Sequence, residues 1–471
     1  MLQLLAISYI LKCNRGSSIL SSATSIFSHC RSTITPPTSC GNTTSIRPMA
    51  RLLMLDSWVY ATGITVPLAI RELGHTYTLL TPNPSRFKNN PLGDGIHPVI
   101  AEAEAVVVAN VNDDTTLLET ARRLHEQSRF DAVITSCDHY LIAAARVAEM
   151  LELPTVGSNV VRTTRDKYLM RLASCSAGVP TPQFGIAATH QEALAIAQRI
   201  GYPVVVKPTD MSASAFVALA MTDAELLSAT DAVTCYRQNA RGQDLNAVAL
   251  IEEFLDGQEV SVETVTVNGA TQVIAVTDKS LYSDTLFIET GHMVPAILDP
   301  ETVRAVGDLA EAALRAVGYS HGVAHTEIKL TSRGPRVVEI NPRVGGNWIS
   351  ELVRITVGFD LIQAFVKLSL GATDLSDCFL APVARSAAIQ FLLPPSPGIL
   401  AGVSNWDEIV SDPYVHRSHL DPFMRGKKVA APKNNDSYLA HVLCIDRAGV
   451  DARAHCERLV AAIELTYLER H

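Results

Sequence analysis

Two acidic segments in the second half of the chain carry residue types that bind a divalent cation. The segments TEIKL and VVEINPR flank a polar turn that contains Gly and Pro, which predicts a pair of antiparallel strands. With the turn centred on Arg333, Glu327 stands opposite Glu339 at about 5 Å, where two carboxylates repel each other unless a cation lies between them. With the amide oxygen of Asn341 they form a set of hard oxygen ligands that suits Mg²⁺, and Mn²⁺ as a substitute.

An exposed hairpin with solvated charges is the alternative interpretation of these segments. The residues around the polar side chains are largely apolar in VVEINPRVGGN, and a polar group inside a buried strand needs a partner. Gly345 and Gly346 permit close approach to the backbone. Sites of this type usually take their remaining ligands from nucleotide phosphates and water, so the pattern favours a metal-nucleotide site.

A lysine at the end of an apolar run is the second candidate for phosphate binding. Lys207 ends the run YPVVVK, where a buried ammonium group needs an anion or a partner. The loop that follows contains Ser212 and Ser214 and is made of small residues, so its backbone N–H groups could surround phosphates. The alternative is a structural lysine at a strand end.

The segment IEEFLDGQEVSVE suits the base and sugar of a nucleotide. The end of this predicted strand can present backbone donors and acceptors to an adenine edge. Its residues are Glu252, Glu253, Phe254 and Leu255. Glu259 follows at a position that suits ribose hydroxyl groups. Solvated acidic residues are the alternative here.

The order of predicted elements indicates how these residues are positioned. A length of 471 residues with 47% apolar and 18% charged residues predicts a globular protein of about three domains. Short apolar strands alternate with helices from Arg51 onward, which predicts a Rossmann-like parallel sheet, although DSWVYATG replaces the dinucleotide fingerprint after the first strand. Later strands joined by short turns predict antiparallel α+β structure. The predicted divisions are 1–48 as a disordered leader or upstream extension, 49–160 as the Rossmann-like domain, 161–265 as a small α+β lid, 266–375 as a larger subdomain with the metal hairpin, and 376–471 as a C-terminal lobe.

Charge and cysteine usage exclude several classes of protein. The net charge of −9 and the absence of a basic stripe argue against nucleic-acid binding, and no apolar run is long enough to span a bilayer. The cysteines lack metal-site spacing. The first 48 residues are rich in Ser and Thr and have no acidic residue, which fits either an organellar transit peptide or an extension upstream of a true start at Met49. We therefore expect a cytoplasmic protein, or an organellar one if the leader is a transit peptide.

Four sequence blocks follow one another in the order RDKYLMR, GYPVVVKPTDMSASAFV, EEFLDGQEVSVE and HTEIKLTSRGPRVVEINPR. In this order they resemble the ATP-grasp superfamily of carboxylate–amine ligases. The resemblance covers about residues 50–465. Four further segments are FIETGHMVPA and, in the tail, PSPGILAGV, GKKVAAP and LAHVLCIDRAG. They look most like the branch of L-amino-acid ligases that forms dipeptides. The fold implied is the ATP-grasp fold with an N-terminal Rossmann-like domain and a small C-terminal lobe, an α/β plus α+β architecture.

The resemblance also implies the roles of individual residues. It places ATP phosphates on Lys167 and Lys207, adenine on Glu252 to Leu255, ribose on Glu259, and Mg²⁺ on Glu327, Glu339 and Asn341, with Arg343 stabilising an acyl phosphate and the tetrahedral intermediate. One departure is the phosphate loop, which is usually rich in glycine but reads DMSASAFV here. Ala and Ser resist a positive φ, so closure of this loop is in question.

We therefore predict an ATP-dependent ligase that joins small amino acids or related carboxylic acids through an acyl phosphate. His292, Gly345 and Gly346 are the candidates for contacting these substrates, with a surface or packing role as the alternative for the histidine. A carboxylase or formyl-phosphate transferase of the kind found in purine synthesis is the alternative enzyme. A nucleotide-binding protein without catalysis is the alternative from another class. The sequence leaves the oligomeric state open, with a homodimer as one candidate.

Overall fold

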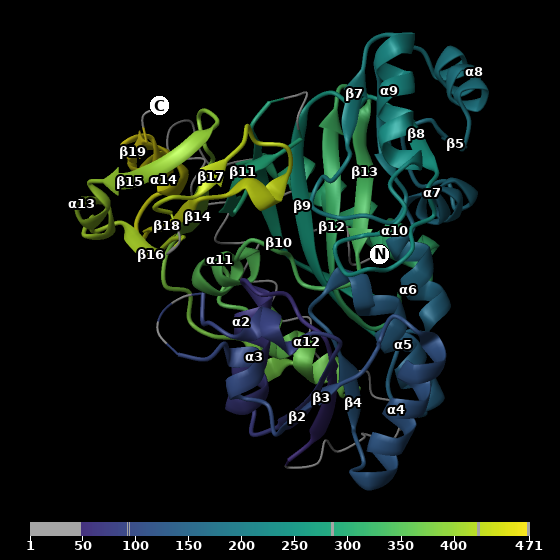
Figure 1. Ribbon diagram of the computed structural model, residues 1–471, viewed down its shortest axis with the longest axis vertical. Coiled ribbons are helices and arrows are strands. Elements are labelled where there is room, and N and C mark those ends of the chain that lie inside the picture. Colours follow the sequence, from purple (N-terminus) through teal and green to yellow (C-terminus); the bar gives the residue numbers. More distant parts are fainter. Residues whose placement is uncertain (1–48, 92, 94, 284–286, 422–423, 469–471) are drawn as a thin grey trace, which may run out of the picture.

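The computed structural model describes residues 49–91, 93, 95–283, 287–421 and 424–468. The predicted leader, residues 1–48, lies outside the described residues. In the described part, the first strands form a parallel sheet in the order β3-β2-β1-β4, which confirms the predicted Rossmann-like domain (Figure 1). Its elements are β1 (Arg51–Leu55), α2 (Thr62–Glu72), β2 (Thr76–Thr81), η1 (Pro84–Phe87), α3 (Pro98–Ala101), β3 (Ala105–Val108), α4 (Asp114–Gln127), β4 (Ala132–Ile134), η2 (Asp138–Tyr140) and α5 (Leu141–Met150).

Helices cover both faces of this parallel sheet. Leu52 and Met54 of β1 pack with α2, whereas Leu53 and Leu55 pack on the opposite face with α4 and α5. Because the strands are parallel, the carboxyl ends of the neighbouring strands β1 and β4 lie at the same edge of the sheet. The residues that follow these strands therefore meet there.

A smaller antiparallel sheet follows, in the part of the chain that we predicted to form a lid subdomain. Its described strands run in the order β5-β8-β6-β7. Val204 and Val206 of β6 pack under the covering helices, so the intervening Val205 and the following Lys207 face the opposite side. The elements are α6 (Ser158–Arg165), α7 (Lys167–Ser176), β5 (Phe184–Ala187), α8 (His190–Ile200), β6 (Val204–Pro208), β7 (Ala218–Ala220), α9 (Asp223–Thr234) and β8 (Ala249–Glu253).

The largest sheet runs from the predicted metal hairpin into the C-terminal part of the chain. Its described strands have the order β13-β12-β9-β10-β11-β14-β18-β16 and are antiparallel throughout the pairs between them (Figure 1). The predicted division between residues 265 and 266 falls inside β9. The elements are β9 (Gln258–Val267), β10 (Ala270–Leu281), β11 (Glu289–Val294), α10 (Pro300–Ala316), β12 (Gly322–Thr331), β13 (Gly334–Asn341), α11 (Ile349–Thr356), α12 (Leu361–Ser369), η3 (Ser376–Cys378), β14 (Ser386–Leu392), β16 (Val415–Leu420) and β18 (Ala440–Asp446).

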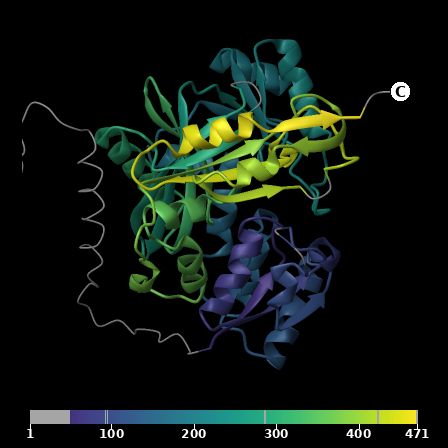
Figure 2. The same ribbon diagram turned by 90° about the vertical axis from the view of Figure 1, so that its left-hand side faces the viewer.

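The C-terminal lobe is built on the far end of this sheet. Figure 2 shows its strands lying beside the upper part of the molecule, above the N-terminal domain. A second small sheet in the order β17-β15-β19 and helix α14, which packs on β14 and β18, complete it. These elements are β15 (Gly398–Ser404), α13 (Trp406–Val410), β17 (Lys428–Val429), η4 (Asn435–Ser437), α14 (Ala452–Ala461) and β19 (Glu464–Tyr467).

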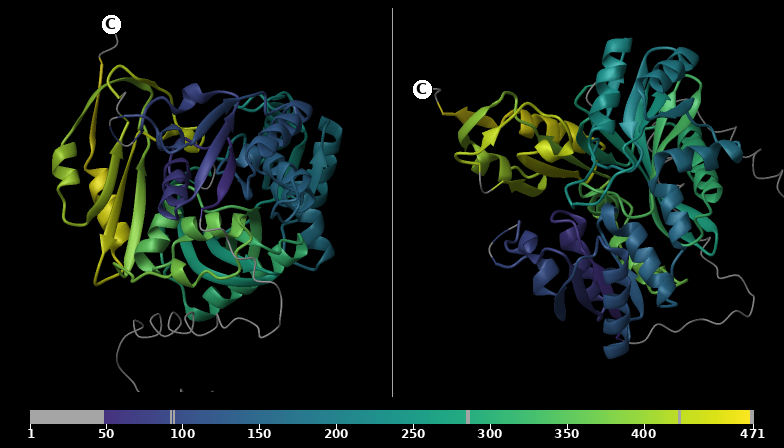
Figure 3. Two further views of the ribbon diagram at one scale, coloured as in Figure 1. Left: turned by 90° about the horizontal axis from the view of Figure 1, so that it is seen from below. Right: turned by 45° about the vertical axis from the view of Figure 1, so that its right-hand side comes forward.

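One hydrophobic core joins the N-terminal domain to the large sheet. Leu52 and Ile70 of the N-terminal domain belong to the same buried cluster as Trp348, Leu352 and Phe359, which follow β13 in the chain. The lid, the N-terminal domain and the C-terminal lobe surround the large sheet from three sides (Figure 3). This arrangement encloses the cavity described next.

Candidate active site

The carboxylates of the hairpin lie opposite each other, as predicted. Glu327 of β12 pairs with Glu339 of β13, and both line a large cavity. The turn is closed by the pair Thr331 and Gly334, so its centre lies half a residue before the predicted centre at Arg333. A break in the strand register directly after Glu327 compensates for this shift and keeps Glu327 opposite Glu339. The predicted pairing is therefore confirmed, with a different local geometry.

Each of these carboxylates has a lysine partner. Lys279 Nζ lies 3.1 Å from Glu327, and Lys167 Nζ lies 3.0 Å from Glu339. Asn341 is buried beside them, and its side-chain oxygen is 3.5 Å from Arg343 Nη2. In the described part of the chain no three His, Cys, Asp or Glu side chains are arranged to hold a metal ion by themselves. Two carboxylates and an amide oxygen are hard oxygen donors, and such a set fits Mg²⁺ when phosphate and water complete its ligands.

Lys279 is the centre of the buried charge cluster and was missed by the sequence analysis. Its side chain is 2% exposed, and its ammonium group lies 2.7 Å from Glu259, 2.8 Å from Glu289 and 3.1 Å from Glu327. Burial alone would lower the pKa of Lys279, but the three carboxylates hold that pKa well above its usual range. A lysine in the apolar strand ATQVIAVTDKSL carries the same signal that identified Lys207.

A second charge cluster holds Lys207. Glu252 lies 2.5 Å from Lys207 Nζ and 2.5 Å from Arg171 Nε. Burial raises the pKa of Glu252, but the two cations outweigh burial and lower that pKa to about 2. The Glu252 carboxylate is therefore already paired within the protein.

The other residues predicted to contact adenine lie at the end of β8 and directly after it. The backbone N–H of Glu253 donates to Gln183, and that of Phe254 donates to Pro203. Glu253 also forms an ion pair with Arg333. Glu253, Phe254 and Leu255 all line the cavity. The adenine contact of these residues stays a prediction.

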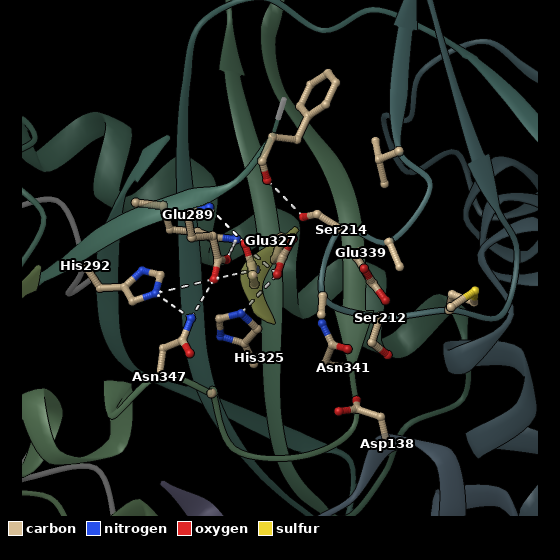
Figure 4. Close-up of a pocket in the computed structure, with 18 of the residues that line it drawn as sticks. Asp138, Ser212, Ser214, Glu289, His292, His325, Glu327, Glu339, Asn341 and Asn347 are labelled. Atoms are coloured by element: carbon tan, nitrogen blue, oxygen red, sulfur yellow. Dashed lines mark hydrogen bonds and ion pairs between the residues drawn. The ribbon is translucent and has the colours of Figure 1, made fainter. Parts of the chain in front are cut away.

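The glycine-poor loop adopts the backbone conformation that its residues resist. Ala213, Ser214 and Phe216 have φ values of 59°, 56° and 58°. Each non-glycine residue in this region costs on the order of 1 kcal/mol or more, so the loop stores strain. Ser212 accepts a hydrogen bond from Arg165 (3.0 Å), and the Ser214 hydroxyl donates to the backbone carbonyl of Phe287 (2.9 Å) across the cavity (Figure 4). The loop thus lies over the cavity despite its composition.

The predicted substrate residues separate into two groups. His292 and Gly346 line the cavity, whereas a side chain at Gly345 would press against His325 and Ile349, so Gly345 serves close packing. Beside His292, the amide of Asn347 donates to Glu289 (2.8 Å) and lies 3.3 Å from the ring (Figure 4). Burial raises the pKa of Glu289, but Lys279 and His292 hold it well below its usual range. Glu289 and Asn347 were not identified from the sequence.

A buried histidine of β12 links the hairpin to the neighbouring strand β9. His325 Nδ1 lies 2.9 Å from Glu263, and its Nε2 lies 3.3 Å from Glu327 (Figure 4). Ser261 and Thr277 donate to the same Glu263 oxygen. Burial lowers the pKa of His325, but the two carboxylates outweigh burial and raise that pKa to about 9.

Arg343 is held by the N-terminal domain. Its Nε donates to Asp138 at 2.7 Å and its Nη1 donates to the Val344 carbonyl at 2.9 Å. Asp138 also accepts from the indole N–H of Trp58 at 3.1 Å. All these residues line the same cavity, whose volume is about 630 Å³, a size typical of sites for small ligands.

Comparisons with known proteins agree with this architecture. Residues 69–155 match the ATP-grasp N-terminal domain, residues 200–351 match the ATP-grasp domain, and residues 390–467 match the L-amino acid ligase C-terminal domain 2. The chain belongs to the ATP-grasp superfamily. Its C-terminal domain match makes it most like the amino-acid ligases of this superfamily.

Relatives of this ATP-grasp protein include ligases. It is 29% identical over 270 residues to an alanine–anticapsin ligase of Bacillus subtilis, covering 54% of this chain and 56% of the relative. It is 27% identical over 335 residues to an uncharacterized protein of Sinorhizobium fredii, covering 68% and 67%. The chain thus spans little more than half of the alanine–anticapsin ligase.

Solved structures share the fold. An L-amino acid ligase from Bacillus licheniformis has a TM-score of 0.75 at 23% identity, covering 89% of this chain and 99% of that one. The biotin carboxylase domain of a Hydrogenobacter thermophilus 2-oxoglutarate carboxylase, solved with MgADP, has a TM-score of 0.64 at 17% identity, covering 88% and 90%. None of the helices in the described part of the ATP-grasp protein combines the length and hydrophobicity needed to cross a membrane.

Proposed function

We propose that this ATP-grasp protein is an ATP-dependent ligase that forms an amide bond between two small amino acids or related acids. The observation that carries the proposal is the hairpin, where Glu327 and Glu339 face each other, each with its own lysine, beside Arg343. The match to the amino-acid ligase C-terminal domain supports the substrate class. The protein's own substrates are part of this proposal.

The lysine partners suggest how the site takes up Mg²⁺ and ATP. Lys279 and Lys167 neutralise the hairpin carboxylates in the protein alone. A divalent cation held by Glu327, Glu339 and Asn341 would replace this neutralisation and supply charge stabilisation to the phosphates. The two ammonium groups would then be free to pair with phosphate oxygens. The cluster thus exchanges partners without leaving a buried charge unpaired.

The chemistry requires two steps. In the first, a carboxylate oxygen of the donor acid attacks the γ-phosphorus of ATP and ADP leaves. In the second, the amine nitrogen attacks the carbonyl carbon of the acyl phosphate, the C–O bond to phosphate breaks, and the nitrogen loses a proton. Arg343 can stabilise the negative charge that develops in both steps, because it lies beside Asn341. The loop that carries Ser212 and Ser214 would exclude water from the acyl phosphate.

The charges around Glu289 suit the donor amino acid. Its carboxylate lines the cavity next to His292 and Asn347, and an ammonium group is the natural ligand for such an anion. We therefore assign the α-amino group of the donor to Glu289. This places the donor's carboxylate on the side of the hairpin.

ADP release with a panel of amino-acid pairs tests the proposal. We expect Mg²⁺-dependent ADP release that needs two amino acids, together with a product whose mass is that of a dipeptide. Release with bicarbonate or formate instead would favour a carboxylase or formyl-phosphate transferase. No release with any acid would favour a nucleotide-binding protein without catalysis.

A further inference from the structure

A loop of the lid subdomain crosses to the N-terminal domain. This crossing loop, residues 235–248 between α9 and β8, is tied by side-chain amides on both sides. Asn112 donates to the backbone carbonyl of Arg241 at 2.8 Å, and Gln243 donates to the backbone carbonyl of His139 at 3.0 Å. The crossing loop therefore brings Arg241 to the edge of the parallel sheet, where it lines the cavity.

Arg241 is buried with unused hydrogen-bonding capacity. Its side chain is 7% exposed, and its guanidinium lies over the Trp58 ring at 5.5 Å from the ring centre. Nη2 donates to the Ser57 carbonyl at 3.2 Å. Nη1 lies 3.6 Å from Asp56 and, among the residues that the structure describes, has no hydrogen-bond partner. A buried guanidinium with a free donor edge indicates a site for an anion.

The charged groups around Arg241 also indicate an anion site. Asp56 is fully buried and is shared by two guanidinium groups, those of Arg241 and Arg86. Asp138, at the end of the neighbouring strand, is also shared by two arginines, one of which is Arg343. Each aspartate therefore faces two positive charges. Arg165 has a second carboxylate partner in Glu339, and Arg86 is a quarter exposed. Arg241, whose Nη1 has no hydrogen-bond partner among the described residues, is therefore the arginine that can take an anion.

Arg241 lies close to the proposed reaction centre without being part of the nucleotide site. Trp58 stacks against Arg241 and donates its indole N–H to Asp138, which in turn accepts from Arg343. One indole and one carboxylate thus separate the two arginines. The lysines assigned to ATP contact other carboxylates, namely Glu339 and Glu252.

We propose that Arg241 binds the carboxylate of the second, amine-donating substrate, which is therefore an amino acid with a free carboxylate. Its amine then lies towards Arg343 and the acyl phosphate. Because Arg241 belongs to the lid and its neighbours belong to the N-terminal domain, the bound carboxylate also holds these two parts together. This inference rests on the proposed ligase function.

Two acceptors that differ only in the carboxylate test the proposal. Purified wild type, Arg241→Met and Arg241→Lys are assayed with ATP, the donor acid and either an amino acid or its carboxamide. The matched control is Arg237→Met, which changes an exposed arginine of the same crossing loop. Hydroxylamine replaces the acceptor in a third assay, where hydroxamate formation reports the acyl phosphate alone. Thermal unfolding of each variant shows whether it is folded.

We expect wild type and Arg237→Met to prefer the free amino acid over its carboxamide by about 30-fold in kcat/KM, a range typical of charge-assisted hydrogen bonds. Arg241→Met should lose this preference through a rise of about tenfold or more in KM for the amino acid, and Arg241→Lys should retain part of it. The KM for ATP and hydroxamate formation should stay within about twofold of wild type for Arg241→Met.

Other results would overturn the assignment. A wild type that forms hydroxamate but accepts the carboxamide as well as the amino acid has no carboxylate site of this kind. Retained preference in Arg241→Met places the site elsewhere. A parallel rise in the KM for ATP means that Arg241 binds phosphate. Absence of hydroxamate with every acid in wild type refutes the proposed ligase function itself, a result distinct from the other three.

Discussion

Asp138 and Arg343 are joined by a hydrogen bond of 2.7 Å between residues 205 positions apart in the chain. The bond links the carboxyl end of β4 in the N-terminal domain to the residues just after β13. Burial raises the pKa of Asp138, but Arg343 and Arg165 outweigh burial and hold that pKa well below its usual range. The carboxylate thus stays charged and fixes one edge of the guanidinium, while Nη2 lies 3.5 Å from the side-chain oxygen of Asn341.

We predict that Asp138→Asn slows amide formation while leaving ATP binding nearly intact. An amide keeps the shape of the side chain but loses the charge that orients Arg343. We expect kcat to fall about 10- to 100-fold and the KM for ATP to change less than about twofold, as measured by steady-state ADP release. The control is Asp114→Asn, an exposed aspartate on α4 that pairs with Arg146. An equal loss of ATP affinity would instead make Asp138 part of the nucleotide site.

Glu339→Gln should weaken the response to Mg²⁺. The substitution removes one of two carboxylates opposite each other while keeping its volume, and the amide oxygen can still accept the hydrogen bond from Lys167. We expect turnover to fall at least about 100-fold and the apparent Mg²⁺ affinity for nucleotide binding, measured by calorimetry, to fall at least about tenfold. The exposed Glu311→Gln on α10 is the control. Unchanged Mg²⁺ dependence in Glu339→Gln would remove this residue from the metal site.

Lys279→Met should destabilise the protein in a way that Mg²⁺ reverses in part. The substitution leaves Glu259, Glu289 and Glu327 close together without their shared cation. Breaking a buried cluster in this manner costs about 3–5 kcal/mol, so the unfolding midpoint in urea should fall clearly. Because a divalent cation can occupy the vacated position, Mg²⁺ alone should raise the midpoint of the variant more than that of wild type. Equal shifts in both proteins would contradict this account of the cluster.

The sequence predicted the residues of the hairpin because strand pairing is a local property. Glu327 and Glu339 are separated by a short turn, so their pairing could be read from the spacing, although a turn shift and an irregularity compensate each other. Lys207 was recognisable as a cation in an apolar strand. Lys279 carried the same signal and was missed because its carboxylate partners come from three other strands.

Contacts between domains could not be predicted in the same way. Asp138 directly follows a predicted strand, and nothing in its neighbours indicates that Arg343 lies beside it. Arg241 lies in a polar segment that reads as an ordinary surface loop. Its burial depends on how the lid meets the N-terminal domain, which is set by packing far from the loop. The C-terminal strands likewise continue the large sheet, a relation that no local pattern encodes.

His139 should make the contact between the crossing loop and the N-terminal domain sensitive to acid. Its Nδ1 lies 3.1 Å from the Asn239 side-chain amide, so the neutral ring accepts this hydrogen bond. Burial lowers the pKa of His139 to about 4 from its ordinary 6.5; Asp138 opposes this shift, whereas Arg165, Arg241 and Arg86 add to it. The unfolded chain therefore binds more protons than the folded one between these pH values. The contribution of the neutral ring to the free energy of unfolding is fully present above pH 6.5 and is lost as the pH falls towards 4.

We predict that His139→Gln flattens this acid limb. The glutamine carbonyl can accept the hydrogen bond from Asn239 but cannot take up a proton. Between pH 6.5 and 4, the free energy of unfolding should therefore fall by on the order of 1–3 kcal/mol less in the variant than in wild type. Urea unfolding at several pH values measures both curves. Asn239→Ala is the control, because it removes the donor and keeps the imidazole: its curve should lie below that of wild type and keep the steep decline. Parallel curves for His139→Gln and wild type would show that protonation of this ring does not oppose folding, and that the acid limb comes from other groups.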